Sequence, residues 1–309
     1  MKIVCVLFMV FALSTTLSEA ACLKTPVAPF NDQHYYATAQ SLTGHTLHTA
    51  LHNIIRNHHR FTYKCVWDIL KDTDEDVTNS DHVRLLYLEQ SIPKSRRDQG
   101  QNDNNSWNRE HVWAKSHGFP RQGQHAYTDV HHLRPADRSI NNSRGNKEFD
   151  NGGSPHHECT QCRTDSNSWE PGDQMKGDVA RMMLYMDVRY EGTEDGGTPN
   201  LVLEDRMTAH PGAQNPNFGK LCTLVQWHVA DSVSAWERRR NNRVYAWQHN
   251  RNPFIDHPEW VMPIWGMSCL EGQPPGETET TKIQLLERIE QMEDDLRELK
   301  DLVTGMDDE

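Results

Sequence analysis

The chain has 309 residues, of which 36% are hydrophobic, with a formal net charge of −12 and a mean hydropathy of −0.81. This length suits one large globular domain or two ordinary ones. After the first 20 residues, no stretch approaches the roughly 18 consecutive apolar residues of a membrane-spanning helix. The composition therefore excludes an integral helical membrane protein and predicts a globular protein with a polar surface.

Residues 1–20 have the pattern of a secretory signal peptide. Lys2 supplies a positive charge, residues 3–13 form an apolar segment too short to span a bilayer, and Ala20 ends a run suited to cleavage. A buried N-terminal helix and a lipoprotein anchor at Cys22 are the alternatives. We predict cleavage after Ala20, and hence a protein that is secreted or periplasmic.

The cysteines fit export. Cys5 leaves with the signal, and six remain: Cys22, Cys65, Cys159, Cys162, Cys222 and Cys269. An even number in an oxidising compartment predicts disulfides, but the sequence cannot rank their connectivities. Only the bond between Cys159 and Cys162 is a local prediction. A zinc site that combines this pair with His156 is the alternative, although a fourth ligand is not evident.

Residues 42–63 have helical spacing of apolar residues, at Leu47, Leu51, Ile54 and Ile55. Residues 98–108 are rich in turn formers and predict a polar loop. Two strand-like pieces follow, near His111–Trp113 and Asp129–Leu133.

A helix is predicted after Pro135, because Asp137 is a suitable N-cap. Residues 151–172 contain Gly, Pro and two close cysteines, and predict a long loop. A buried helical stripe follows, formed by Val179, Met182, Met183 and Met186. We therefore expect residues 21–270 to form one mixed, loop-rich domain.

The composition changes after Cys269. Residues 271–281 resemble a linker, and residues 282–305 carry an apolar seam at spacings of four and three: Leu285, Ile289, Met292, Leu296, Leu299 and Val303. A short coiled coil that joins copies into a homo-oligomer is predicted, and a helix folded back on the main domain is the alternative. Residues 271–309 hold 13 acidic and four basic residues, so most of the negative charge lies in this tail.

Basic side chains in the main domain form three groups: Lys94, Arg96 and Arg97; Arg134, Arg138 and Arg144; and Arg238, Arg239, Arg240 and Arg243. Such groups can neutralise phosphates, although charge runs are more often solvated surface. Arg109, Arg134 and Arg138 are the candidate substrate-binding residues.

Glu110 and His111 are the residues with the clearest chemistry. Hydrolysis of a phosphodiester needs a base with a pKa near neutral, for which His is suited, and a hard cation that takes oxygen ligands. Neighbouring side chains on a strand point to opposite faces, so both could serve one site only if the strand twists or bulges there.

The flanking residues resemble the bacterial endonuclease I family of ββα-metal (His-Me finger) nucleases. The resemblance runs from about Asn53 to Gly266. Its anchors are NREHVW at 108–113, DVHHLRPAD at 129–137, INNSRGN at 140–146, GDVARMMLYM at 177–186 and NRNPFIDHPEW at 250–260. Five such blocks in one order are specific.

The resemblance implies an α+β fold around a ββα-metal finger, with His111 as general base and Glu110 and Asn141 as ligands of one Mg²⁺ or other divalent cation such as Mn²⁺. Family members also hold the cleaved phosphate with an arginine between the two strands. Arg121 is the nearest candidate here, and Arg144 on the helix is the alternative.

The sequence thus predicts a sequence-non-specific endonuclease that cleaves DNA, with RNA as an alternative substrate, and leaves 5′-phosphates. An exported zinc-binding or scaffolding protein with an inactive nuclease core is the competing hypothesis.

Overall fold

The computed structural model describes residues 22–100, 103–192, 196–207 and 215–270, together with the single positions 291, 294 and 297. The predicted signal peptide, the linker and nearly all of the predicted coiled-coil tail lie outside these residues. Within the described part, no helix is both long and apolar enough to cross a membrane.

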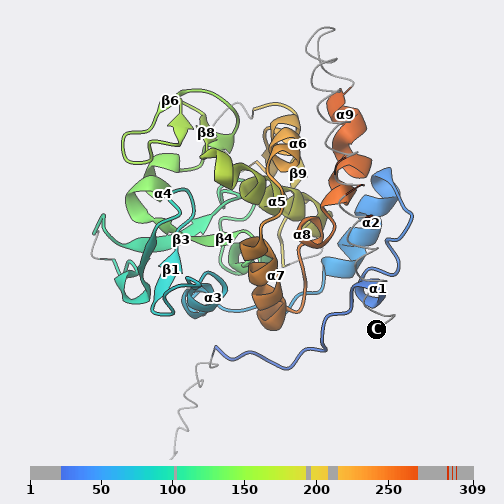
Figure 1. The fold of residues 1–309 in the computed structure, drawn as a ribbon, viewed down its shortest axis with the longest axis horizontal. Coiled ribbons are helices and arrows are strands. Elements are labelled where there is room, and N and C mark those ends of the chain that lie inside the picture. The colour runs from blue at the N-terminus through green and yellow to red at the C-terminus, as the bar shows by residue number, and fades with distance from the viewer. Residues whose placement is uncertain are drawn as a thin grey trace, which may run out of the picture.

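Helices and small sheets alternate along the chain, which confirms the α+β prediction (Figure 1). The α-helices are α1 (Asp32–Tyr35), α2 (Gly44–Ile55), α3 (Val66–Thr73), α4 (Arg138–Arg144), α5 (Asp173–Arg189), α6 (Leu221–Ala230), α7 (Ala235–Gln248), α8 (Pro253–Asp256) and α9 (Met267–Leu270). The strands are β1 (His82–Arg84), β2 (Ser91–Pro93), β3 (Trp107–His111), β4 (Leu133–Asp137), β5 (Glu148–Phe149), β6 (Ser154–Pro155), β7 (Arg163–Thr164), β8 (Ser168–Glu170), β9 (Val202–Leu203) and β10 (Asn217–Phe218).

Helix α5 runs through the centre of the molecule (Figure 1) and packs against α6 and α2. The predicted apolar stripe is in the core, and the helix is buried on all sides from Gly177 to Arg189. Its buried charges are paired: Arg181 donates to both carboxylate oxygens of Glu237, at 2.6 and 2.9 Å. Pairing of this kind is what permits charged groups on a fully buried helix.

Strands β3 and β4 and helix α4 form the ββα unit. The strands are antiparallel, with Glu110 opposite Arg134 and His111 opposite Leu133. Asp137 ends β4 and caps α4, because its Oδ1 accepts hydrogen bonds from the backbone N–H groups of Ser139 and Ile140. The predicted N-cap is confirmed.

The bounds predicted for both strands were wrong. β3 ends at His111 instead of beginning there, and β4 begins at Leu133 instead of ending there. For β4 the cause lies at Asp129, whose Oδ1 accepts the backbone N–H of His131 at 2.9 Å. This Asx-type bond folds residues 129–132 into a turn.

The segment 151–172 was predicted as a loop but contains three short strands. β6, β7 and β8 join β5 in a four-stranded sheet of order β5-β8-β7-β6. Two-residue and three-residue strands of this kind leave little periodic signal in a sequence.

The six described cysteines form three disulfides, Cys22–Cys65, Cys159–Cys162 and Cys222–Cys269. The predicted local bond is confirmed. Because a disulfide leaves no thiolate to bind metal, the alternative zinc site at Cys159 and Cys162 is not formed. His156 instead bonds Ser143 Oγ through Nε2 at 2.7 Å.

Candidate active site

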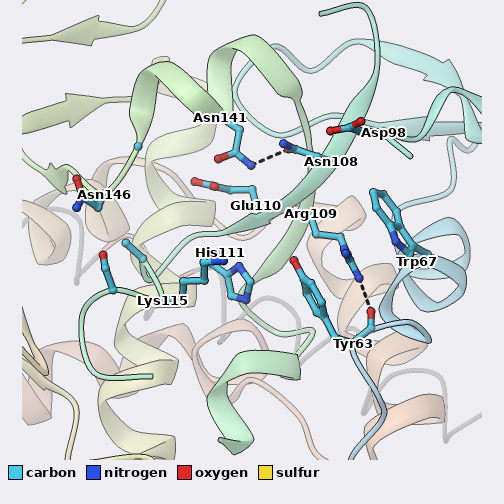
Figure 2. A pocket seen from close by; sticks show the side chains of 13 residues that line it. Tyr63, Trp67, Asp98, Asn108, Arg109, Glu110, His111, Lys115, Asn141 and Asn146 are labelled. Atoms are coloured by element: carbon cyan, nitrogen blue, oxygen red, sulfur yellow. Dashed lines mark hydrogen bonds between the residues drawn. The ribbon is translucent and has the colours of Figure 1, made fainter. Parts of the chain in front are cut away.

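A pocket of about 550 Å³ opens beside β3 and the end of α4 (Figure 2). Its lining residues are Tyr63, Trp67, Asp98, Asn108, Arg109, Glu110, His111, Ala114, Lys115, Ser116, Asn141, Gly145 and Asn146. It therefore brings together Glu110, His111, Asn141 and Arg109, four residues that the sequence singled out.

Glu110 and His111 reach this pocket from opposite faces of β3. The Glu110 carboxylate meets Tyr87 and Arg144, whereas the His111 ring lies against Tyr127. The pairing with β4 is regular through His111, so no bulge is needed. β3 and β4 make a two-stranded sheet, and side chains from both faces of β3 can line a pocket at its outer edge.

His111 is held as a neutral imidazole with a defined tautomer. Its Nε2 lies 3.0 Å from the backbone oxygen of Tyr127. A carbonyl can only accept, so Nε2 carries the proton and Nδ1 keeps its lone pair. Burial lowers the pKa of His111 well below its ordinary value, and neighbouring His132 adds to this. Nδ1 is therefore the nitrogen at which the ring can accept a proton.

Glu110 is held by a buried ion pair. Its Oε1 accepts the Tyr87 hydroxyl at 2.8 Å and Arg144 Nη1 at 3.1 Å. Burial raises the pKa of Glu110, and the Arg144 guanidinium opposes this rise. Arg144 also donates to the carbonyls of His111 and Val112, at 2.9 and 2.5 Å. It thereby fixes both the carboxylate and the end of β3.

Asn141 lies on the first turn of α4, above Glu110 in Figure 2. Its Nδ2 donates to Asn108 Oδ1 at 2.7 Å, which turns the amide oxygen of Asn141 toward the space beside the Glu110 carboxylate. A carboxylate and an amide oxygen on one pocket suit Mg²⁺, which is commonly held by one or two protein oxygens, with water and phosphate completing its shell.

Comparison with known proteins decides the family. The sequence profile of the Endonuclease I family matches residues 43–259. The chain belongs to the endonuclease I family. The resemblance deduced from the five sequence blocks is confirmed, and the protein is a nuclease.

Two Bacillus proteins are similar over most of their length. The extracellular ribonuclease of Bacillus amyloliquefaciens is 49% identical over 254 residues, which are 81% of this chain and 84% of that protein. The extracellular ribonuclease of Bacillus subtilis (strain 168) is 49% identical over 245 residues, 79% of this chain and 82% of that protein. The extracellular deoxyribonuclease of Aeromonas hydrophila is more distant, at 26% identity over 133 residues, 41% of this chain and 49% of that protein.

Of the three arginines predicted to bind substrate, Arg109 alone lines the pocket of this endonuclease I chain. Its guanidinium stacks over the rings of Tyr63 and Trp67, with 3.3 and 4.2 Å to the ring centroids, and its Nη1 donates to the Tyr63 carbonyl. Stacking on two aromatic rings fixes the charge of Arg109 in the lining of the pocket.

Arg134 and Arg138 lie outside the pocket lining. Arg134 is buried, and its Nε donates to Asp74 Oδ1 at 2.7 Å, so it belongs to a core ion pair. The half-buried Arg138 bonds Asp98 Oδ2 at 3.1 Å and Asn104 Oδ1 at 3.0 Å. Both arginines thus make contacts within the protein, and neither lines the pocket.

The two candidate phosphate-binding arginines also lie apart from the pocket lining. Arg121 is exposed, and Arg144 is fully buried behind Glu110. Lys115, which the sequence analysis missed, is exposed and lines the pocket on the segment between β3 and β4. Its Nζ lies 3.2 Å from the Tyr127 hydroxyl. No motif marks this lysine in the sequence, since its place follows only from the path of the chain after β3.

The adjacent histidines of the sequence block are packing residues. His131 Nε2 bonds the backbone oxygen of Asn250 at 3.1 Å, and His132 Nε2 bonds that of Ala126 at 2.8 Å. Burial lowers the pKa of each to about 4. Neither lines the pocket, although the His132 ring is 5.6 Å from that of His111.

Proposed function

We propose that this endonuclease I chain is an exported, metal-dependent nuclease that cleaves both RNA and DNA without sequence preference, using His111 as general base. The observation that carries the proposal is the pocket itself. It brings the His111 imidazole together with the Glu110 carboxylate and the Asn141 amide, and this grouping supports the proposal. Family membership favours an enzyme over the competing binding or scaffolding hypothesis.

In this mechanism, Nδ1 of His111 accepts the proton of a water molecule that attacks the phosphorus atom. The Tyr127 carbonyl holds the ring and would stabilise the imidazolium through Nε2. Glu110 and Asn141 would hold one divalent cation, which neutralises charge on the phosphate and on the leaving 3′-oxygen when bound. The buried Arg144 acts as a positioning residue that keeps the Glu110 carboxylate in place.

Substrate contacts would come from the cations at the mouth of the pocket. Arg109 and Lys115 both line it and can approach phosphate oxygens. Backbone phosphates are the same at every sequence position, so contacts of this kind position a strand without reading bases. We therefore assign Lys115 to the phosphate-binding role for which the sequence suggested Arg121 or Arg144.

Both nucleic acids are proposed as substrates because the attacking group is water. A water nucleophile makes no use of the ribose 2′-hydroxyl, so DNA and RNA can follow the same path. The relatives named as ribonucleases and a deoxyribonuclease support this breadth. The predicted signal peptide, three disulfides and the word extracellular in those names support export.

The test is an analysis of product ends from matched RNA and DNA oligonucleotides, in Mg²⁺ and in EDTA. We expect cleavage of both in Mg²⁺, with 5′-phosphate and 3′-hydroxyl ends, and loss of both activities in EDTA. RNA products ending in 2′,3′-cyclic phosphate would contradict water attack, and full activity in EDTA would contradict metal dependence. An RNA with 2′-O-methyl groups is the matched control, and it should still be cut.

A further inference from the structure

A second cluster of metal-binding side chains lies on α2 and at the end of α5. His45 and His48 are one helical turn apart on α2, and Glu191 follows α5. One ligand atom from each lies within 4.8 Å of the others. Figure 1 shows α2 on the opposite side of the molecule from β3 and α4, so this cluster is separate from the nuclease pocket.

His48 is oriented by a carboxylate, as metal-binding histidines usually are. Its Nε2 lies 3.0 Å from Asp187 Oδ2, and Asp187 Oδ1 accepts the backbone N–H of Leu203 at 2.6 Å. Asp187 is thus fixed from behind and accepts the Nε2 proton. The lone pair of His48 is then on Nδ1, which faces Glu191.

The two atoms with which His48 and Glu191 face each other have no hydrogen-bond partner. His48 Nδ1 and Glu191 Oε2 are 3.4 Å apart, and both are shielded from solvent without a hydrogen bond. Two acceptor atoms that face each other repel unless a cation lies between them. A proton on His48 could also fill this role. Burial lowers the pKa of His48, but the carboxylates of Asp187 and Glu191 outweigh burial and raise this pKa above its ordinary value.

We propose that His45, His48 and Glu191 form a site for a transition-metal cation of the Zn²⁺ class. Two imidazoles and one carboxylate are a ligand set that Zn²⁺ prefers, with a fourth position left for solvent. Zinc bonds of this kind set tetrahedral ligands about 3.4 Å apart, a separation that His48 and Glu191 already have. His45 is exposed, and one of its ring nitrogens lies within 4.8 Å of the ligand atoms of His48 and Glu191.

A metal here would join the start of α2 to the end of α5, the central helix of the domain. The expected role is therefore stabilisation of the nuclease fold, since the site contains none of the residues that line the nuclease pocket. The pocket offers oxygen ligands for Mg²⁺, so the two sites also differ in the cation they select.

Calorimetric titration of Zn²⁺ into the metal-stripped full-length protein, with excess Mg²⁺ present, tests this proposal. We expect the wild type to bind one Zn²⁺ ion per protein molecule with high affinity. His45→Ala, which removes an exposed ligand, and Glu191→Gln should each weaken this binding at least tenfold. His157→Ala is the matched control, because His157 is an exposed histidine 3.1 Å from Glu158 and should leave binding unchanged.

Thermal unfolding gives a second readout on the same proteins. Zinc at a hundredfold excess over its Kd should raise the wild-type Tm by roughly 5–10 °C. It should have little effect on His45→Ala or Glu191→Gln, while the Mg²⁺-dependent nuclease activity of His45→Ala stays at the wild-type level. If the wild type binds no Zn²⁺ tightly, or if both variants bind Zn²⁺ as well as the wild type does, the proposed metal site is wrong. A protonated His48 between two carboxylates would then explain the geometry.

Discussion

Replacement of His111 by alanine is expected to lower kcat by about 10²–10⁴-fold, the usual contribution of a general base. The Tyr127 carbonyl leaves Nδ1 of His111 as the proton acceptor, and burial keeps the ring neutral. Alanine removes that acceptor but none of the cations that would contact phosphate. Steady-state kinetics on RNA and DNA in saturating Mg²⁺ should therefore show a loss in kcat with little change in KM.

Two controls separate a lost base from a damaged fold. Added imidazole should restore part of the activity of His111→Ala, because the vacated space can admit a free base, and circular dichroism should show a folded protein. Lys115→Ala, in the same pocket, should instead raise KM by more than it lowers kcat. A loss below tenfold in His111→Ala, or no rescue by imidazole, would contradict the assignment of His111 as base.

Replacement of Arg144 by leucine should lower the free energy of unfolding by about 3–5 kcal/mol, since it leaves a buried carboxylate unpaired. Both partners are almost fully buried, and Arg144 also binds two backbone carbonyls at the end of β3. Urea denaturation measures the loss. Glu110→Gln in the Arg144→Leu background should recover part of it, because the unpaired charge is removed.

The double-mutant cycle distinguishes the structural role of Arg144 from the phosphate contact that the sequence suggested. Coupling between Glu110 and Arg144 is expected because the two side chains are in direct contact. An exposed phosphate-binding arginine would instead change KM and leave stability nearly unaffected. A loss of stability below 1 kcal/mol, with additive single substitutions, would contradict the positioning role.

Local sequence signals predicted the start of the helix in the ββα unit, but they did not predict the bounds of its two strands. The cap at Asp137 depends on bonds to Ser139 and Ile140, two and three positions further along, so the start of α4 could be recognised from the sequence. The strand boundaries could not, because the turn before β4 depends on distant partners of Asp129 as well as on its local bond to His131. Asp129 Oδ2 accepts the hydroxyls of Tyr185 and Tyr190, 56 and 61 residues further along the chain.

The roles of the basic residues were the least predictable part of the site. The sequence offered Arg134 and Arg109 as equal candidates, yet Arg134 pairs in the core with Asp74, which is 60 residues away. The disulfide connectivity could not be predicted for the same reason, because two of the three bonds join cysteines that are 43 and 47 residues apart. Only the Cys159–Cys162 bond, which spans three positions, was a local inference.

The most direct test of the proposed site is the Mg²⁺ concentration that gives half-maximal cleavage of RNA. Asn141 would supply one of the two protein ligands, and its neighbour Asn142 is exposed and does not line the pocket. We expect Asn141→Ala to raise this concentration at least tenfold, whereas Asn142→Ala should match the wild type. An unchanged Mg²⁺ requirement in Asn141→Ala, with an altered one in Asn142→Ala or Asn146→Ala, would contradict the assigned metal site.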